Sequence, residues 1–304
     1  MSVHYTEPSV FGSMTGSPQK PITILTHGYP ESSYIWRRVT GTLSERVPLF
    51  VVDQPGYGLS TPCENGTDKL TAAGAIVDAL TAVHGDGVSI ILAGHDRGAR
   101  TMQRLAVSIA DFPQVKGLGA FLADIVPIVE EYKSFQNPAD AVGYFHWSLL
   151  PRGDFATDVI MAYGGGNWVK KIFEFGSGNN SFATDLFKAD NAWDIYANFF
   201  NQLSVTNASV YDYQAGATVD YDAQVADQAA GRKISMPLHI LYSIYNLETL
   251  SGFNVAEIWS QWVSNGTNLT VQGIGGQRGH FIIEEAPDET ITQINEFMDA
   301  LGVA

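Results

Sequence analysis

Residues 89–100 constrain the fold of this chain more than any other stretch. They begin with an apolar run at 89–93, which is typical of a buried parallel strand. A Gly-His-Asp-Arg-Gly sequence ends the run, and helix-forming residues follow at once. In so tight a turn, a β-carbon at Gly94 or Gly98 would strike neighbouring backbone. An ordinary Gly-flanked turn is one interpretation, but the pattern favours an elbow that raises the Asp96 side chain above the sheet, beside a helix N-terminus.

Strand-like and helical segments alternate on both sides of this elbow. Strands are predicted at 21–26, 49–52, 115–122, 236–242 and 269–271, and helices at 32–43, 70–83, 97–109, 255–262 and 287–301. Such alternation predicts a parallel sheet with right-handed crossovers. Between about 132 and 232 there is no strong strand run, whereas aromatic residues and glycines are frequent. We therefore predict an α/β core made of residues 1–131 and 233–304, with a helical cap at 132–232.

Composition limits the partners of this chain. The sequence has 17 basic and 32 acidic residues, a net charge of −15, which disfavours nucleic acid and anionic membranes as partners. Cys63 is the only cysteine, so neither a disulfide within the chain nor a Cys-based metal site can form. Residues 1–21 lack a signal-peptide pattern, and no apolar run approaches membrane-spanning length. We expect a soluble, cytoplasmic protein that uses no metal and no cofactor.

Asp96 could act as a nucleophile if other groups support it. An ester formed on Asp96 needs a general base to activate water, and the base needs an acidic partner to orient it. His280 follows the last predicted strand on a Gly-rich loop, in the order nucleophile, acid, histidine that hydrolases use. By itself it could equally be a surface histidine. Asp124, directly after the strand that follows the elbow helix, is the predicted acid, although it could also be a helix N-cap. Glu248 is the alternative.

Two groups of donors are predicted around Asp96. The backbone N–H groups of Tyr29 and Arg97 are candidates for stabilising charge on the Asp96 carboxyl group, and Gly28 would let the first of them come close. The side chains of Arg97 and Arg100 stand three residues apart on the first turn of a helix, so both can face one pocket. Surface arginines paired with acidic residues would have the same spacing. Because a planar guanidinium suits a carboxylate, we expect this pair to bind an anionic substrate.

The predicted cap contributes three further candidates. His146 and Trp147 lie near its start and Tyr213 near its end. Each carries an N–H or O–H donor on an apolar body, and together they could hold a small anion such as a leaving halide. Taken singly, each is better explained by aromatic packing of the cap on the core.

These residues together resemble the fluoroacetate (haloacetate) dehalogenases, which have the α/β-hydrolase fold and are related to epoxide hydrolases. The matching segments run over nearly the whole chain and are 27–31, 53–58, 94–100, 146–147, 212–213, 279–281 and 284–287. The resemblance implies a mostly parallel central sheet flanked by helices, with a helical cap insertion. It also suggests a homodimer.

The resemblance implies a role for each candidate. Asp96 would attack the α-carbon of a short 2-haloacid, and His280, oriented by Asp124, would activate the water that hydrolyses the ester. The groups that would bind the substrate carboxylate are Arg97 and Arg100. The groups that would bind the leaving halide are His146, Trp147 and Tyr213.

Some segments depart from the family pattern. Gln214 follows Tyr213 where the family suggests Arg, Arg278 adds a charge near the predicted base, and residues 247–253 are unlike the short loop expected there. These departures leave open a bulkier carboxylate substrate. Epoxide hydrolysis is the second hypothesis, since cap tyrosines could donate to an epoxide oxygen; the candidates are Tyr144, Tyr163, Tyr211 and Tyr213. A protein that binds a ligand without turnover is the third.

Overall fold

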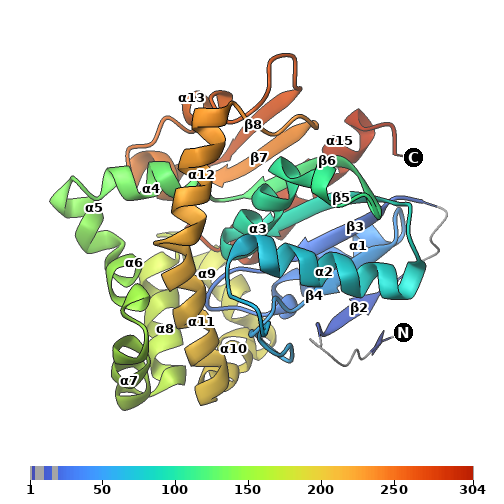
Figure 1. Cartoon of the computed structure of the whole chain (residues 1–304). Coiled ribbons are helices and arrows are strands. Elements are labelled where there is room, and N and C mark those ends of the chain that lie inside the picture. Colours follow the sequence, from blue (N-terminus) through green and yellow to red (C-terminus); the bar gives the residue numbers. More distant parts are fainter. Residues whose placement is uncertain (1, 4–9, 16–19, 304) are drawn as a thin grey trace.

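One sheet organises the molecule. The computed structural model describes residues 2–3, 10–15 and 20–303. Within them the sheet has eight strands in the order β1-β2-β4-β3-β5-β6-β7-β8 (Figure 1). The strands are β1 (Ser2–Val3), β2 (Gly12–Met14), β3 (Ile22–Thr26), β4 (Leu49–Val52), β5 (Val88–His95), β6 (Val115–Ala123), β7 (Leu238–Ser243) and β8 (Leu269–Ile274). β2 is antiparallel to both of its neighbours, and every pair from β4 to β8 is parallel. The predicted, mostly parallel sheet is confirmed.

The two N-terminal strands are not predicted from the sequence. They are only two and three residues long, too short to show an alternation of apolar and polar residues. β2 becomes a strand because β4 offers it a free edge, with Gly12 opposite Val52. Tertiary pairing, rather than local propensity, extends the sheet at this side.

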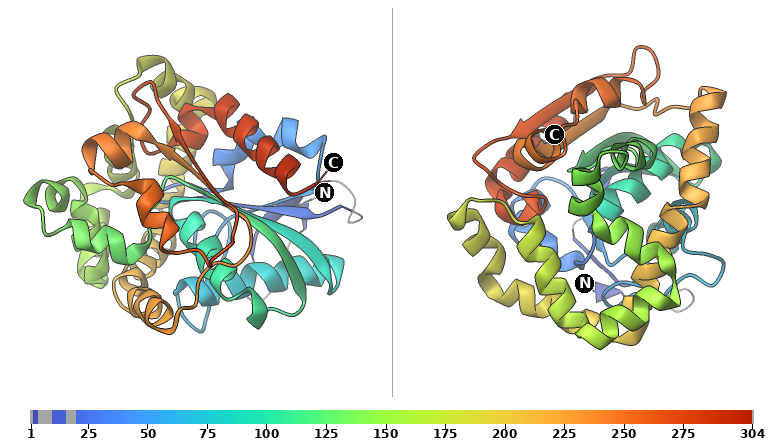
Figure 2. Two further views of the ribbon diagram at one scale, coloured as in Figure 1. Left: turned by 90° about the horizontal axis from the view of Figure 1, so that it is seen from above. Right: turned by 90° about the vertical axis from the view of Figure 1, so that its left-hand side faces the viewer.

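Helices cover both faces of the sheet (Figure 2). Ile90 of β5 packs in a core shared with α2 and α3, whereas its neighbour Ile91 packs on the opposite side with α1 and α15, because successive side chains of a strand alternate between faces. The helices that cover the two faces of the sheet are α1 (Arg37–Ser44), α2 (Lys69–His84), α3 (Asp96–Val107), α13 (Val255–Ser260), α14 (Ile282–Glu285) and α15 (Pro287–Ala300). The predicted helix at 32–43 is divided into a 3-10 turn, Ser33–Trp36, and α1.

The chain between β6 and β7 contains helices and no strand. They are α4 (Ile128–Ser134), α5 (Pro138–Gly143), α6 (Phe145–Leu149), α7 (Asp154–Tyr163), α8 (Gly165–Gly176), α9 (Ser181–Lys188), α10 (Ala192–Phe200), α11 (Leu203–Gly216) and α12 (Val219–Ala230), with two short 3-10 turns among them. The cap boundary predicted at 131/132 falls inside α4, and that at 232/233 just after α12. None of the described helices is long and apolar enough to cross a membrane.

The helical segment lies over the carboxyl ends of the strands (Figure 1). Tyr29 and Tyr57 sit in loops that follow β3 and β4, and they share one aromatic cluster with Trp147, Tyr196 and Tyr213 of the helical segment. In open parallel sheets, ligands bind at this end of the strands. The aromatic cluster therefore encloses the place where the sequence predicts a site.

Candidate active site

The turn between β5 and α3 holds Asp96 with a left-handed φ of +44°. Such a conformation costs a non-glycine residue roughly 1–3 kcal/mol and persists where the surroundings impose it. A β-carbon at Gly94 would lie 2.7 Å from the backbone of α3, and one at Gly98 would lie 2.4 Å from the carbonyl oxygen of His27. The steric need for both glycines is confirmed. A β-carbon at Gly28 would come within 2.5 Å of the Asp96 β-carbon, so only glycine lets this loop approach.

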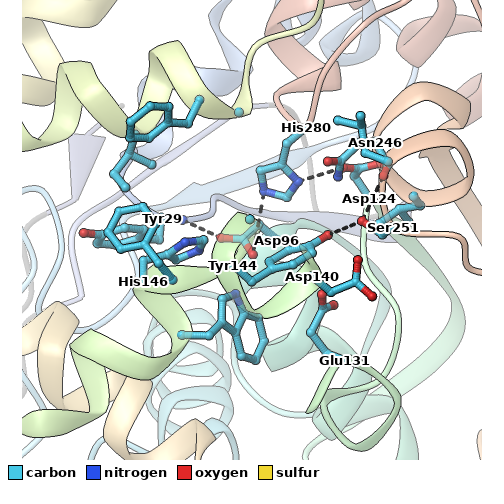
Figure 3. A pocket seen from close by; sticks show the side chains of 18 of the residues that line it. Tyr29, Asp96, Asp124, Glu131, Asp140, Tyr144, His146, Asn246, Ser251 and His280 are labelled. Atoms are coloured by element: carbon cyan, nitrogen blue, oxygen red, sulfur yellow. Dashed lines mark hydrogen bonds and ion pairs between the residues drawn. The ribbon is translucent and has the colours of Figure 1, made fainter. Parts of the chain in front are cut away.

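The loop after β3 supplies a donor to Asp96. The backbone N–H of Tyr29 donates to Asp96 Oδ2 at 2.8 Å (Figure 3). The Arg97 N–H, the other predicted donor, makes no hydrogen bond to this carboxylate in the structure. One backbone donor is thus already aimed at the nucleophile before any reaction begins.

His280 lies between two carboxylates. Its Nε2 is 3.8 Å from Asp96 Oδ1, and its Nδ1 is 2.7 Å from Asp124 Oδ2 (Figure 3). The N–H of Ser243 and the amide of Asn246 donate to Asp124 at 2.7 and 2.8 Å, which fixes the orientation of its carboxylate. The structure therefore brings together Asp96, His280 and Asp124, three residues far apart in the chain.

Glu248, the alternative acid, lies elsewhere. Its carboxylate accepts a hydrogen bond from the Tyr242 hydroxyl at 2.5 Å and makes no contact with His280. Asp124, which directly follows β6, lies nearer to His280 than Glu248, which lies in the segment after β7. Of the two acids that the sequence left open, the structure puts Asp124 against the imidazole.

The charges of this cluster follow from burial and from mutual attraction. Burial acts to raise the pKa of Asp96, but His280 and Arg100 favour the anion and bring the pKa to about 2. Burial acts to lower the pKa of His280, but the hydrogen bond to Asp124 and the charges of Asp124 and Asp96 raise it to about 9. At neutral pH the Asp96 carboxylate is ionised and the imidazole is protonated.

We expect the His280 imidazole to titrate near pH 9 in the resting protein and at lower pH in an Asp96→Asn variant. The Asp96 carboxylate stabilises the imidazolium, so its removal lowers the pKa of His280. NMR titration of the histidine ring protons measures both values. Glu248→Gln is the matched control, since it removes a carboxylate that does not contact His280. Equal pKa values in the wild type and Asp96→Asn would contradict the coupling.

Arg97 does not lie where the sequence predicts it. Its side chain is fully buried, and its Nε and Nη2 donate to the Asp212 carboxylate at 2.8 and 3.0 Å. Arg100 lines the cavity above Asp96, whereas Arg97 does not. The prediction that both guanidinium groups face one cavity is wrong for Arg97, because the carboxylate of Asp212 on α11 binds its guanidinium and Arg97 does not line the cavity. The structure thus places Arg100, and not Arg97, against the space above Asp96.

The three aromatic candidates of the helical segment do meet in the cavity. His146, Trp147 and Tyr213 all line it, and the rings of His146 and Trp147 lie 5.9 and 5.7 Å from that of Tyr213. Their ring N–H and O–H groups make no hydrogen bond to any other described residue. Burial is the main cause that lowers the pKa of His146, to about 4, so its imidazole is neutral near pH 7. Three uncommitted polar groups therefore face the same space as Asp96.

The cavity that contains these groups has a volume of about 190 Å³. It is lined by apolar and aromatic side chains in addition to the catalytic candidates; they are Tyr144, Phe145, Ile172, Phe175, Leu247, Leu250 and Phe281. No group of three or more His, Cys, Asp or Glu residues in the described part of the chain is arranged to hold a metal ion. The lining thus combines a mainly apolar wall with a few charged groups.

Residues 23–293 of the sequence match the Alpha/beta hydrolase family. This chain belongs to that family. It is 26% identical over 292 residues to a fluoroacetate dehalogenase from a Burkholderia species, an alignment that covers 91% of this chain and 87% of the relative. A soluble epoxide hydrolase from Corynebacterium sp. (strain C12) is 30% identical over 116 residues, 38% of each chain.

Similar solved structures extend the comparison. A Pseudomonas aeruginosa protein that is provisionally assigned as an epoxide hydrolase superposes with a TM-score of 0.82 and 25% identity, covering 99% of this chain and 95% of that one. This similarity spans the sheet and the helical segment together. The chain is thus a hydrolase of the alpha/beta family, with similarity to both dehalogenases and epoxide hydrolases.

Several cavity residues are not singled out as site residues by the sequence. Glu131 lies on α4, and its carboxylate pairs with Arg100. The hydroxyl of Tyr144 shares a hydrogen bond with the hydroxyl of Ser251. The side-chain amide of Asn246 donates to Asp124. For Tyr144, the sequence predicts only that it is one of four cap tyrosines that could donate to an epoxide oxygen. Glu131 follows another glutamate in an unremarkable helical stretch, and Asn246 lies on the π-helix Ile244–Leu250. Nothing in the local sequence distinguishes either one from a surface residue.

Proposed function

We propose that this hydrolase cleaves the carbon–halogen bond of a short 2-haloacid through an ester on Asp96. The ionised Asp96 carboxylate attacks the carbon that bears the halogen; a C–O bond forms, and the C–X bond breaks with its electron pair leaving as halide. Loss of the Asp96 charge lowers the pKa of His280, so the imidazole releases its proton and becomes a base.

The second step of this proposal uses water. Neutral His280, held by Asp124, takes a proton from water, and the hydroxide adds to the carboxyl carbon of the Asp96 ester. The bond between the Asp96 carboxyl carbon and the oxygen that now carries the substrate carbon then breaks, and His280 returns the proton to that oxygen. The 2-hydroxy acid leaves, and the oxygen of water remains in the regenerated Asp96 carboxyl group, which ionises again. The N–H of Tyr29, 2.8 Å from the Asp96 carboxyl oxygen, is placed to stabilise the negative charge of the tetrahedral intermediate. The N–H of Arg97 is the second proposed donor.

The observation that carries the proposal is the set of unpaired donors opposite the nucleophile. Trp147, Tyr213 and His146 line the cavity, and the Trp147 Nε1–H, the Tyr213 hydroxyl and the His146 ring make no hydrogen bond to another described residue. A departing halide would supply the missing acceptor. Arg100 is the remaining candidate for binding the substrate carboxylate. The similarity to a fluoroacetate dehalogenase supports the same assignment.

Epoxide hydrolysis remains the second candidate because of Tyr213. Its hydroxyl lies in the cavity without a hydrogen-bond partner and could donate to an epoxide oxygen as Asp96 opens the ring. The alignments with epoxide hydrolases favour this candidate. Both candidates share the ester on Asp96, and they differ in the leaving atom.

Product analysis decides between the two candidates. We expect chloroacetate, bromoacetate or fluoroacetate to yield free halide, measured by ion chromatography, and styrene oxide to yield no diol. Tyr213→Phe should slow halide release by about 10-fold or more, since a donor to the developing anion is lost. Tyr211→Phe is the matched control, because the Tyr211 hydroxyl binds exposed Asp154 on the outer surface. Diol without halide would replace the proposal by epoxide hydrolysis.

A further inference from the structure

Glu131 occupies the position from which it can control what Arg100 binds. We propose that Glu131 is a specificity-determining residue: it competes with the carboxylate of a haloacid for Arg100 and thereby limits how strongly the site prefers a haloacid over its uncharged amide. This inference deepens the proposed function and rests on it for the reacting group, Asp96. The preference between charged and uncharged substrates would then be set by an acidic residue, Glu131, acting on the basic residue Arg100.

The contact between the two side chains is buried but incomplete. Glu131 Oε2 lies 3.3 Å from Arg100 Nη2, and the two residues are only 2% and 3% exposed. Arg100 Nη1 donates to the carbonyl oxygen of Val126 at 2.8 Å. Arg100 Nε and Glu131 Oε1 are buried and have no hydrogen-bond partner. Because both side chains keep a buried atom without a hydrogen bond, the ion pair between them is weaker than a fully hydrogen-bonded one. The carboxylate of a ligand can therefore replace that of Glu131 at Arg100.

The charge of the cavity lining points the same way. Four carboxylates line the cavity; they are Asp96, Asp124, Glu131 and Asp140. The basic groups of the lining are Arg100 and His280, since His146 is neutral. Figure 3 shows Glu131 and Asp140 on the side of the cavity away from His146. A substrate that brings another negative charge must enter against this excess, whereas an uncharged one need not. The apolar side chains of the lining suit an uncharged body as well.

Protonation of Glu131 also changes the strength of its contact with Arg100. Burial raises the pKa of Glu131 to about 7, while Arg100 acts in the opposite direction. The other titratable groups that face Glu131 are His280, Asp96, Tyr132 and Tyr144. Below that pH a neutral Glu131 releases Arg100 to a ligand, whereas above it the ion pair holds the guanidinium.

Inert probes test the inference without any turnover. At pH 8, acetate should bind a Glu131→Gln variant about 10-fold or more tightly than the wild type, and acetamide should bind both within about 2-fold, as measured by NMR or calorimetric titration. Glu130→Gln is the matched control, since the neighbouring Glu130 pairs with Lys133 at the surface. Equal acetate affinity in the Glu131→Gln variant and the wild type would overturn the inference.

The wild type offers a test that does not depend on a folded variant. Its affinity for acetate, relative to acetamide, should rise by about 10-fold between pH 8 and pH 6, because Glu131, with a pKa of about 7, gains most of its proton over this range. Asp96 and His280, with pKa values of about 2 and 9, keep their charges over it. A ratio that stays constant with pH contradicts the competition for Arg100.

Turnover separates a failure of this inference from a failure of the proposed function. In the Glu131→Gln variant the ratio of kcat/KM for chloroacetate over chloroacetamide should rise by about 10-fold, mainly through a lower KM for chloroacetate. If no haloacid or haloamide releases halide, the proposed function fails while the acetate result still decides the role of Glu131. If halide is released with an unchanged ratio, only the role of Glu131 fails.

Discussion

In a His280→Ala variant we expect a stable ester to accumulate on Asp96 during incubation with chloroacetate. The first step needs only the ionised carboxylate of Asp96, whereas hydrolysis of the ester needs a base 2.7 Å from Asp124 and 3.8 Å from Asp96, which the variant lacks. Turnover should fall by roughly 10³-fold or more. Intact mass spectrometry detects the adduct, and peptide mapping places it on the segment that contains Asp96.

The control for this experiment is a histidine outside the site. His84→Ala, at the end of α2, should keep wild-type turnover and form no lasting adduct. An Asp96→Asn,His280→Ala double variant should form no adduct at all, because it has no nucleophile. If His280→Ala hydrolyses the substrate as fast as the wild type, or if the adduct lies on a residue other than Asp96, the two-step scheme is wrong. Binding without any adduct would instead support the hypothesis of a non-catalytic binding protein.

In an Asp212→Asn variant we expect the free energy of unfolding to fall by about 3–5 kcal/mol. Asp212 is 5% exposed, and its carboxylate binds Arg97, the Lys69 ammonium at 2.6 Å and the Tyr57 hydroxyl at 2.9 Å. The variant leaves two buried cations without this anion. Urea denaturation followed by tryptophan fluorescence should show a lower midpoint with an unchanged slope.

The matched control replaces the same residue type at the surface. Asp194 pairs with Lys170, and both side chains are about half exposed, so Asp194→Asn should cost less than about 1 kcal/mol. Burial raises the pKa of Asp212, but Arg97 and Lys69 outweigh burial and hold the pKa below its usual value. The stability from this carboxylate is therefore present above the unfolded pKa of about 3.9 and is lost as the pH falls further. A variant as stable as the wild type at pH 7 would contradict the structural role of Asp212.

Much of the core could be read from the sequence because local constraints act there. Two glycines flank Asp96 since the turn leaves no room for a β-carbon, and this restriction is visible in the sequence alone. Buried parallel strands such as β5 and β7 carry mostly apolar side chains on both faces, so they stand out as largely apolar runs. The order of Asp96, Asp124 and His280 along the chain also indicates that the loops after β5, β6 and β8 meet at the site.

The contents of the cavity were harder to predict because they depend on contacts between distant segments. Helical spacing correctly put Arg97 and Arg100 on neighbouring positions of α3, but spacing does not say which partner each will find. Asp212, 115 residues further on, binds Arg97, and Glu131 approaches Arg100. The choice of Asp124 over Glu248 likewise depended on where the loops after β6 and β7 end.

The sequence by itself determined the parallel part of the sheet, the elbow and the identity of the acidic side chain raised at its tip, because backbone sterics and the burial of strands act over a few residues. Only the tertiary structure decided which charges face the cavity and which are neutralised beneath it. The physical reason is that a buried charge takes the nearest partner of opposite sign, and packing of the helical segment on the core selects that partner.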